Sequence, residues 1–268
     1  MRNLLLLVMA ALILSVTPVP SVALDSSPNL SELKLVTQLP AELPQRVMGF
    51  AFDGEKLWAT VYHGDGRYAT LDPATLTWKA KLLREHDDLI GRVANPRTSP
   101  GGICFGQGKL WMSGGYGESI ASIDTQTLKV EELITGKRRQ DHHASQSYSS
   151  LAFDGNYLWV VWHWFRYDLP VWQTQLLLKV DLQGGQVLAE YPAPAGTRPD
   201  GAHGLTWDGT RLWHVKDNRL SSIDPTTGEV TAKYQLAHLK RPSGLAWVKD
   251  SLWIVEFNGK VWQLPFAR

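Results

Sequence analysis

The sequence is poor in cysteine, with a single copy, Cys104, among 268 residues. One thiol cannot form a disulfide within the chain, so the hydrophobic core must hold the fold together. We expect Cys104 itself to be a small core residue. An excess of one charge sign is also missing, because 27 basic side chains are balanced by 26 acidic ones. This balance argues against a nucleic acid as the partner.

An apolar run occupies the N-terminus, but it is too short to span a bilayer comfortably. Arg2 precedes the run Leu4 to Val16, and Ser21-Val22-Ala23 resembles a signal-peptidase site. These three features in this order are typical of a secretory signal peptide. We predict a signal peptide at residues 1–23, a secreted or periplasmic protein, and no membrane contact after cleavage. An uncleaved anchor is the alternative.

Tryptophan is abundant, with twelve copies, and five of them mark an internal repeat. Each of the five follows a leucine and a short apolar stretch such as GFAFDG, SSLAFDGN or HGLTWDG. An Asp-Gly turn between two apolar runs is a strong signal for a β-hairpin. The pairs are spaced 53, 48, 54 and 40 residues apart and lie at Leu57-Trp58, Leu110-Trp111, Leu158-Trp159, Leu212-Trp213 and Leu252-Trp253.

Two further strands follow each hairpin. The third strand ends in a turn led by Asp, as in TLDPATL and SIDPTTG, and the fourth reads as in TWKAKLL or EVTAKYQL. Four antiparallel strands in roughly 40 to 55 residues have the period and content of a β-propeller blade. The sequence therefore predicts an all-β fold, a five-bladed β-propeller with four antiparallel strands per blade.

The two ends of the chain complete one blade between them. The fifth repeat stops after its third strand, whereas residues 33–40, LKLVTQLP, form a strand with no hairpin before it. Joining the two closes the ring and removes exposed sheet edges. We expect an N-terminal strand to complete the last blade, with residues 24–32 as a short linker and 33–268 as a single propeller domain.

Repetition also explains residues that could be mistaken for a site. The tryptophan after each leucine is expected to pack between blades. Asp53, Asp154 and Asp208 precede glycine in the hairpin turns and need no chemical role.

The candidate ligand-binding residues lie on one face of the predicted propeller. Connections from the second to the third strand, and from the fourth strand to the next blade, share this face and vary in length. Variable loops on a rigid scaffold usually carry function. The candidates on this loop-rich face are Tyr62, His63, Tyr116, Trp162, His163, Trp164, Arg166, His203, Lys216, Asp217 and Arg241.

An insertion in the third blade concentrates the aromatic candidates. Trp159 and Asp181 are 22 residues apart, whereas the equivalent Trp213 and Asp224 are only 11 apart. Aromatic rings beside an arginine and a histidine can stack on a sugar, a peptide or an amine and hydrogen-bond it. The alternative is that the rings seal the top of the barrel against solvent.

Charged candidates lie at the ends of the second strands of blades four and five. Lys216, Asp217 and Glu256 follow the repeated tryptophan by three or four residues, and His203 precedes the first strand of blade four. A carboxylate beside a cation or an imidazole, in a channel mouth that excludes water, can act as an acid or base. The alternative is a structural ion pair between adjacent blades.

Two loops carry side chains that metals can bind, namely Glu85-His86-Asp87-Asp88 and Asp141-His142-His143. Oxygen and imidazole groups suit metal ions, but neither loop has a spacing that enforces coordination. We interpret both as solvated loops and predict neither a metal nor a cofactor.

The order of the segments GGYGES, SLAFDGNYLWVVW, DGAHGLTWDGTRLW and SGLAWVKDSLWIVEF resembles the plant-type glutamine cyclotransferase (glutaminyl cyclase) family. The resemblance runs over most of the mature chain. It implies an exported five-bladed propeller that converts an N-terminal glutamine to pyroglutamate with loss of ammonia and without a metal.

The chain departs from that family at two positions. The family commonly has an acidic residue where this chain has Met112, and Glu-Gly-Leu where it has Ser149-Ser150-Leu151. The cyclisation needs a positioned proton acceptor. In this chain Glu118 or Glu256 would have to supply it, as the candidate catalytic residues.

The sequence favours an exported, monomeric β-propeller that binds a small ligand or a peptide or protein partner on its loop-rich face. The fold alone does not decide this, because propellers host both enzymes and scaffolds. A glutaminyl-peptide cyclotransferase-like enzyme is the alternative. A metal-dependent hydrolase or lactonase is a third candidate, with Glu256 and Asn218 as the available parts of a metal cage.

Overall fold

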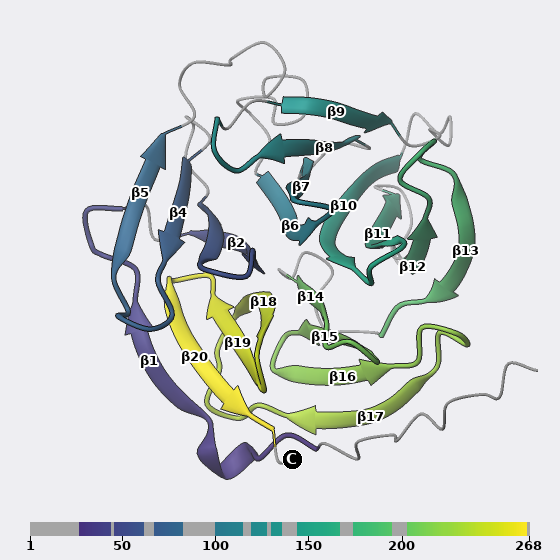
Figure 1. Ribbon diagram of the computed structural model, residues 1–268. Helices are drawn as coiled ribbons and strands as arrows, with labels where there is room; N and C mark the ends of the chain where they lie inside the picture. The colour runs from purple at the N-terminus through teal and green to yellow at the C-terminus, as the bar shows by residue number, and fades with distance from the viewer. Residues whose placement is uncertain are drawn as a thin grey trace, which may run out of the picture.

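In the described part of the computed structural model, twenty strands form five four-stranded sheets around a central axis (Figure 1). The strands of every sheet pair antiparallel, and the first strand of each blade lies nearest the axis (Figure 1). The predicted five-bladed β-propeller with four antiparallel strands per blade is confirmed. The structure describes residues 27–43, 46–61, 67–82, 100–114, 119–127, 130–135, 144–166, 174–194 and 203–266.

The strands follow chain order within each blade. Blade 1 contains β2 (Val47–Phe52), β3 (Leu57–Val61), β4 (Arg67–Leu71) and β5 (Trp78–Leu82). Blade 2 contains β6 (Pro100–Gly106), β7 (Lys109–Gly114), β8 (Ser119–Asp124) and β9 (Val130–Thr135). Blade 3 contains β10 (Ala144–Phe153), β11 (Leu158–Arg166), β12 (Thr174–Val180) and β13 (Val187–Pro192). Blade 4 contains β14 (His203–Trp207), β15 (Leu212–Lys216), β16 (Arg219–Ile223) and β17 (Val230–Gln235).

Blade 5 is built from both ends of the chain. Its inner strands are β18 (Pro242–Val248), β19 (Ser251–Glu256) and β20 (Lys260–Pro265), and β1 (Lys34–Gln38) pairs antiparallel with β20 as the outermost strand. The two strands lie side by side in Figure 1, one at each end of the colour scale. The predicted closure of the ring by the N-terminal strand is therefore confirmed. A short 3₁₀ turn, Leu30–Glu32, precedes β1.

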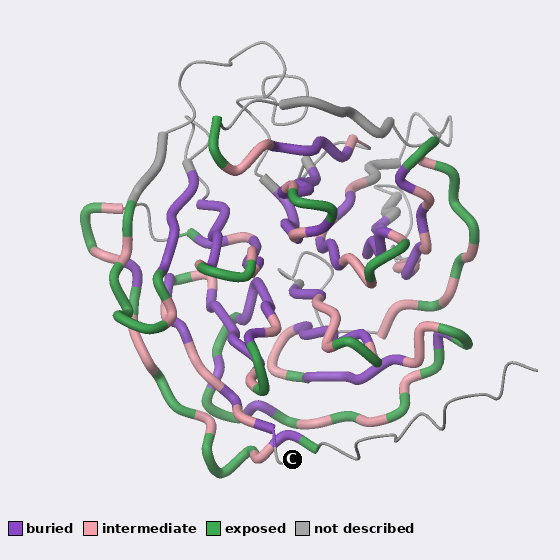
Figure 2. The backbone as a smooth tube through the Cα atoms, in the orientation of Figure 1, coloured by how far each residue is buried: buried purple, intermediate pink, exposed green. Residues whose placement is uncertain are grey.

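The core consists of apolar clusters between neighbouring blades. Buried residues follow the inner strands, whereas the outer strands β13 and β17 alternate between exposed and half-buried positions (Figure 2). The five tryptophans of the Leu-Trp pairs are all buried, so their predicted packing role is confirmed. Cys104 is buried as expected. Among the described residues, no helix is long and apolar enough to cross a membrane.

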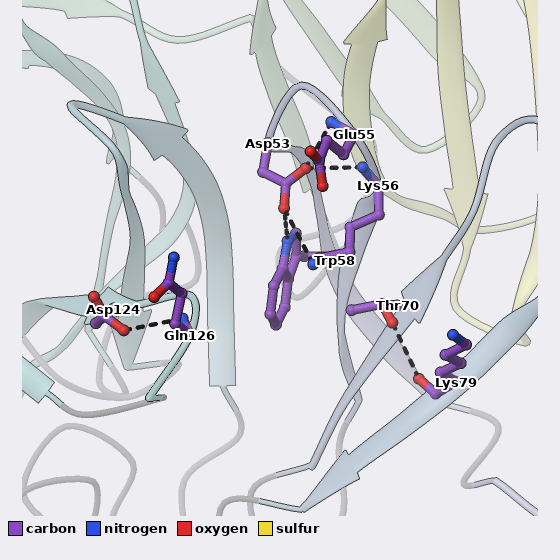
Figure 3. Close-up of polar contacts among 8 residues, drawn as sticks. All are labelled: Asp53, Glu55, Lys56, Trp58, Thr70, Lys79, Asp124 and Gln126. Atoms are coloured by element: carbon purple, nitrogen blue, oxygen red, sulfur yellow. Dashed lines mark hydrogen bonds and ion pairs between the residues drawn. The ribbon is translucent and has the colours of Figure 1, made fainter.

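The hairpin-turn aspartates hold the buried tryptophans as well as the turns. In blade 1, Asp53 Oδ1 accepts the backbone N–H groups of Glu55 and Lys56, and Oδ2 accepts the indole N–H of Trp58 at 2.6 Å (Figure 3). The same indole bond joins Asp154 to Trp159 at 2.8 Å and Asp208 to Trp213 at 2.7 Å. A buried indole N–H needs such a partner. The structural role expected for these aspartates is confirmed. Their hydrogen bond to the indole was not expected from the sequence.

Glycines let the inner strands of neighbouring blades approach closely. A Cβ added to Gly102 would lie 2.3 Å from Ser150 Cα in blade 3, and one added to Gly244 would lie 2.6 Å from Phe50 N in blade 1. Gly49 and Gly204 meet the next inner strand in the same way. Blade 3 is the exception, because its equivalent residue is Ser150. The interface between blades 3 and 4 must therefore accommodate a side chain where the four others accommodate none.

Candidate functional site

The interface between blades 3 and 4 changes from apolar to polar as it approaches the loop-rich face. At the hairpin-turn end, Trp159, Val161 and Leu212 belong to one buried cluster. Side chains alternate along a strand, so His163 lies on the same side of β11 as Val161. By the same rule, His214 and Lys216 lie on the same side of β15 as Leu212.

We call Ser149, Ser150, His163, His214 and Lys216 the polar layer. Its three large side chains are almost completely buried, with exposed fractions of 7 % for His163, 1 % for His214 and 2 % for Lys216. Burying an ammonium group and two imidazoles costs free energy that an apolar interface would not spend. The polar layer is therefore a feature that packing alone does not explain.

Burial and the lysine charge keep both imidazoles neutral. Burial, and to a smaller extent the nearby Lys216 ammonium, together lower the pKa of His163 to about 3. The pKa of His214 also falls to about 3, first through burial, then through Lys216 and His163. A neutral imidazole offers one N–H donor and one acceptor nitrogen. At neutral pH the layer thus combines one cation with two uncharged hydrogen-bonding rings.

A β-bulge connects the layer to the surface. The register of β10 and β11 shifts between Tyr148 and Ser150, which leaves Ser149 as the extra residue. Ser149 is partly exposed, and its Oγ lies 2.6 Å from Nε2 of His163. The hydroxyl also lies 3.3 Å from the carbonyl oxygen of Val161. Ser149 is therefore the member of the layer that lies closest to solvent.

Ser150 adds a second hydroxyl on the side of the interface. It pairs with Val161 across the sheet and lies on the same side of β10 as Ala152, which belongs to the cluster between blades 3 and 4. The residue is 1 % exposed, and its Oγ has no hydrogen-bond partner within the described part of the chain. Buried hydroxyls are normally satisfied, so this one points to a missing partner.

Glu256 is the last residue of β19 in blade 5 and is buried, at 2 % exposed. Its Oε1 accepts the backbone N–H of Lys240 at 2.5 Å and of Arg241 at 3.3 Å. Its Oε2 accepts the indole N–H of Trp262 at 3.1 Å. The carboxylate therefore joins the loop before β18 to strand β20. The structure shows this structural contact, and a catalytic role for Glu256 stays a prediction.

Arg241 and Asp217 also lie in structural positions. Arg241 is exposed, and its guanidinium carbon lies 3.9 Å from the ring centre of Phe257. Asp217 has a φ of 55° in the two-residue turn that joins β15 to β16. Aspartate is one of the residues that tolerate this left-handed conformation.

Two residues singled out from the sequence lie in the core between blades. Trp162 is 7 % exposed and packs in the cluster between blades 2 and 3, on the opposite side of β11 from His163. This packing leaves little of the ring available to a ligand. Met112 lies in the cluster between blades 1 and 2, where its sulfur accepts a hydrogen bond from the hydroxyl of Tyr68.

The remaining candidates fall wholly or partly outside the described residues. Strand β11 includes the backbone of Trp164 and Arg166, and His203 pairs with Lys216 at the start of β14. The side chains of these three are not described. Four further candidates lie entirely outside the described ranges, namely Tyr62, His63, Tyr116 and Glu118.

No group of three potential metal ligands occurs in the described ranges. The two loops with metal-capable side chains, residues 85–88 and 141–143, lie outside those ranges. Of the two cage candidates, Asn218 lies in the turn after β15, where its carbonyl accepts the N–H of Leu236 at 2.7 Å. Glu256 is engaged within blade 5 as described above.

Sequence reasoning missed three members of the polar layer, namely His214, Ser149 and Ser150. The signal for His214 was present, because in LWHVK it occupies the same strand face as Leu212 and Lys216. Ser150 stands out only when the starts of the five inner strands are aligned, since the other four have glycine there.

Comparison with solved structures finds matches at low sequence identity. A glutaminyl cyclase from Myxococcus xanthus superposes with a TM-score of 0.60 and 10 % identity, over 87 % of this chain and 96 % of that one. A virginiamycin B lyase from Staphylococcus aureus, solved with quinupristin, has a TM-score of 0.43 and 15 % identity. This match covers 87 % of this chain and 99 % of that one. A chain of a nidogen/laminin complex has a TM-score of 0.47 and 13 % identity, and the match covers 80 % of this chain and 73 % of that one.

At 10 % identity, the similarity to the glutaminyl cyclase shows a shared fold and nothing finer. No protein-family model matches the chain, and no curated protein matches it.

Proposed function

We propose that the protein is an exported β-propeller that binds a small molecule or a peptide at the loop-rich end of the interface between blades 3 and 4. One observation supports this above the others. A buried cation and two buried neutral imidazoles occupy that end, while the opposite end of the same interface is apolar.

The energetic argument for function is that the polar layer is a poor solution for stability. Replacing buried charged groups by well-packed apolar ones is often neutral or stabilising by about 1–4 kcal/mol. Proteins tend to retain such unfavourable arrangements where activity needs them. A binding role explains why His163, His214 and Lys216 stand where leucine or valine would pack.

A ligand panel tests the proposal. We expect at least one small molecule or short peptide to raise the melting temperature saturably, because a ligand at a hundred times its Kd adds about 2.7 kcal/mol to folding stability. The effect should disappear in Lys216→Met. It should persist in Lys233→Met, which removes an exposed lysine from the outer strand of the same blade. Ligands that stabilise wild type and Lys216→Met equally would place the site elsewhere.

Export is part of the proposal and has its own test. Signal-peptidase cleavage after Ala23 would leave Leu24 as the first residue of the mature protein. N-terminal sequencing of protein recovered from the medium or the periplasm checks this position. An intact N-terminus on protein in the membrane fraction would support an uncleaved anchor.

A glutaminyl-peptide cyclotransferase is the second candidate, and one contact favours it. Ser149 stands where the family carries a glutamate, and the neutral His163 lies 2.6 Å from its hydroxyl. This imidazole is a proton acceptor within reach of the position, although its low pKa makes it a weak base.

Ammonia release from a peptide with N-terminal glutamine tests this activity. Enzymatic turnover should exceed the spontaneous rate and should fall in His163→Gln, Glu118→Ala or Glu256→Gln. The last variant keeps one oxygen acceptor for the bonds of Glu256, so it separates catalysis from stability better than alanine does. No release at high protein concentration would exclude the cyclotransferase and leave the binding proposal standing.

A further inference from the structure

Blade 5 differs from the other blades in how its two outermost strands are held together. In blades 1, 3 and 4 a short turn led by aspartate joins the third strand to the fourth, as in blade 4, where the N–H of Asp224 donates to the carbonyl of Glu229 at 2.9 Å. The equivalent strands of blade 5 are β20 and β1, which come from opposite ends of the sequence. Hydrogen bonds and packing therefore take the place of a turn. We call the contact of β20 with residues 28–38 the seam.

The seam is closed by contacts around Phe266, the residue that follows β20. Phe266 forms an isolated β-bridge with Pro28. Next to this bridge, the N–H of Asn29 donates to the carbonyl of Pro265 at 3.1 Å. The N–H of Phe266 donates to the carbonyl of Asp250 at 3.0 Å, which ties the seam to the turn between β18 and β19. The end of β20 thus lies beside the turn that precedes β1 (Figure 1).

The ring of Phe266 joins the seam to the interface between blades 4 and 5. The side chain is buried and belongs to the apolar cluster between these two blades. Its ring centre lies 4.9 Å from that of Trp213 in blade 4, at an interplanar angle of 78°. The distance to the ring of Trp247 in blade 5 is 4.8 Å, at 79°. Edge-to-face contacts of this kind are favourable for aromatic rings.

Strand β1 itself is held by few contacts with the core. None of its five residues is buried, and Leu35 is 47 % exposed. Its pairing with β20 is interrupted by a register shift between Leu35 and Thr37. Within the described part of the chain, β1 is covalently joined to the fold at one end only, through the segment that leads to β2. A strand held at one end gains more chain entropy when it detaches than a strand held at both ends.

We propose that the propeller opens at the seam, where β1 and the turn before it detach from β20 as one unit while the other blades stay folded. Phe266 is the latch that holds the seam closed. Opening exposes the backbone edge of β20, and an unpaired strand edge is a template for pairing with another chain. The latch therefore protects the protein from association through this edge.

Strand β17 provides an internal comparison. It is also an outermost strand without a buried residue, and its pairing with β16 also contains a register shift. Unlike β1, it is joined to the fold at both ends, by the turn from β16 and by the segment that leads to β18. The two strands therefore differ mainly in the seam.

Amide hydrogen exchange of the folded full-length protein, followed by mass spectrometry, tests the proposal. Exchange reports local opening that occurs without global unfolding. After correction for intrinsic rates, the amides of β1 should exchange about tenfold faster than those of β17, or more. Equal rates in β1 and β17 would overturn the proposal. Exchange of β1 at the rate of the buried strand β15 would do the same, because it would show that β1 opens only when the whole protein unfolds.

Variants test the latch. Phe266→Ala should speed the exchange of β1 by about a further tenfold and leave β17 within about twofold of wild type. Tyr191→Ala is the matched control, because this ring stacks on Trp159 of blade 3 at 6.1 Å and lies outside the seam. It should leave the exchange of β1 unchanged. Equal acceleration of β1 and β17 in Phe266→Ala, or faster exchange of β1 in Tyr191→Ala, would show general destabilisation and refute the latch.

A cross-link covers the case in which Phe266→Ala does not fold. Lys34 and Gln263 lie opposite each other in β1 and β20. Opposite Cα atoms in antiparallel strands are about 4.5–5.5 Å apart, which suits a disulfide. In the oxidised Lys34→Cys/Gln263→Cys variant β1 is held at both ends, so its exchange should slow to within about threefold of β17, and reduction should restore the faster rate. Unchanged exchange after oxidation, with the cross-link verified by mass, would contradict opening at the seam.

Discussion

Replacing Asp208 by alanine removes three hydrogen bonds from one hairpin of blade 4. Its Oδ1 accepts the backbone N–H groups of Thr210 and Arg211, both at 2.7 Å, and its Oδ2 accepts the indole N–H of Trp213. The indole is completely buried, so its N–H would be left without a partner. An orphaned buried donor costs about 1–3 kcal/mol, and each turn bond contributes about 0.5–1.5 kcal/mol. We expect a loss of about 4 kcal/mol in total, near the middle of the summed range.

Asp224→Ala is the matched control in the same blade. Asp224 Oδ1 accepts two backbone N–H groups of its own turn, from Thr226 and Thr227, and bonds no indole. Its loss should therefore cost only the two turn bonds, about 1–3 kcal/mol. The difference between the two variants measures the bond to Trp213 together with the ion pair between Asp208 Oδ2 and Arg211 Nε, which lie 3.5 Å apart.

Urea unfolding followed by tryptophan fluorescence measures both variants. We expect Asp208→Ala to unfold at the lower urea concentration, with a free energy of unfolding about 2 kcal/mol below that of Asp224→Ala. In a protein of this size that difference corresponds to roughly 4–8 °C in melting temperature. Equal stability of the two variants within about 0.5 kcal/mol would refute the argument that the aspartate stabilises the buried indole.

Three further predictions concern the interfaces. Burial keeps the pKa of His163 and His214 near 3 in the folded protein, so these two imidazoles take up protons only in the unfolded chain as the pH falls below 6.5. The free energy of unfolding should therefore drop by about 4 kcal/mol between pH 7 and pH 5. His214→Gln should halve the drop in urea-unfolding experiments, and an unchanged pH slope would show that His214 is not buried in its neutral form. Gly102→Ala should cost about 3 kcal/mol or more, since the new Cβ meets the backbone of blade 3. Gly184→Ala, whose Cβ would meet nothing within 4 Å, should be neutral or slightly stabilising in the same assay. Equal losses of stability in Gly102→Ala and Gly184→Ala would contradict the close approach of the inner strands at Gly102. Burial raises the pKa of Cys104, so a thiol reagent should modify it only after unfolding, and rapid modification of native protein would contradict its core position.

Most of the fold could be predicted from the sequence because its determinants are local and repeated. Alternating apolar residues and Asp-Gly turns specify a hairpin wherever they occur, and five copies of one pattern specify five copies of one blade. The ring closure followed from counting strands at the two ends. The bond from Asp208 to Trp213 is equally local, since the two residues are five positions apart.

The candidate site was less predictable because its members belong to different blades. Lys216 was identified from its place at the end of a strand, and His163 from the aromatic insertion, but nothing in the sequence brought them to one interface. Glu256 was grouped with Lys216, yet the structure engages it with the backbone and Trp262 of its own blade. Similar positions in successive blades do not show which side chains face each other.

The sequence by itself determined the architecture of this protein, because strand periodicity and turn chemistry act over a few residues and repeat. Only the tertiary structure decided where the polar groups meet. The packing of β11 against β15 turns two separate strand ends into one layer of His163, His214 and Lys216. Burial in that interface then keeps the two imidazoles neutral. A pKa depends on the surroundings in space, which the order of residues along a strand does not contain.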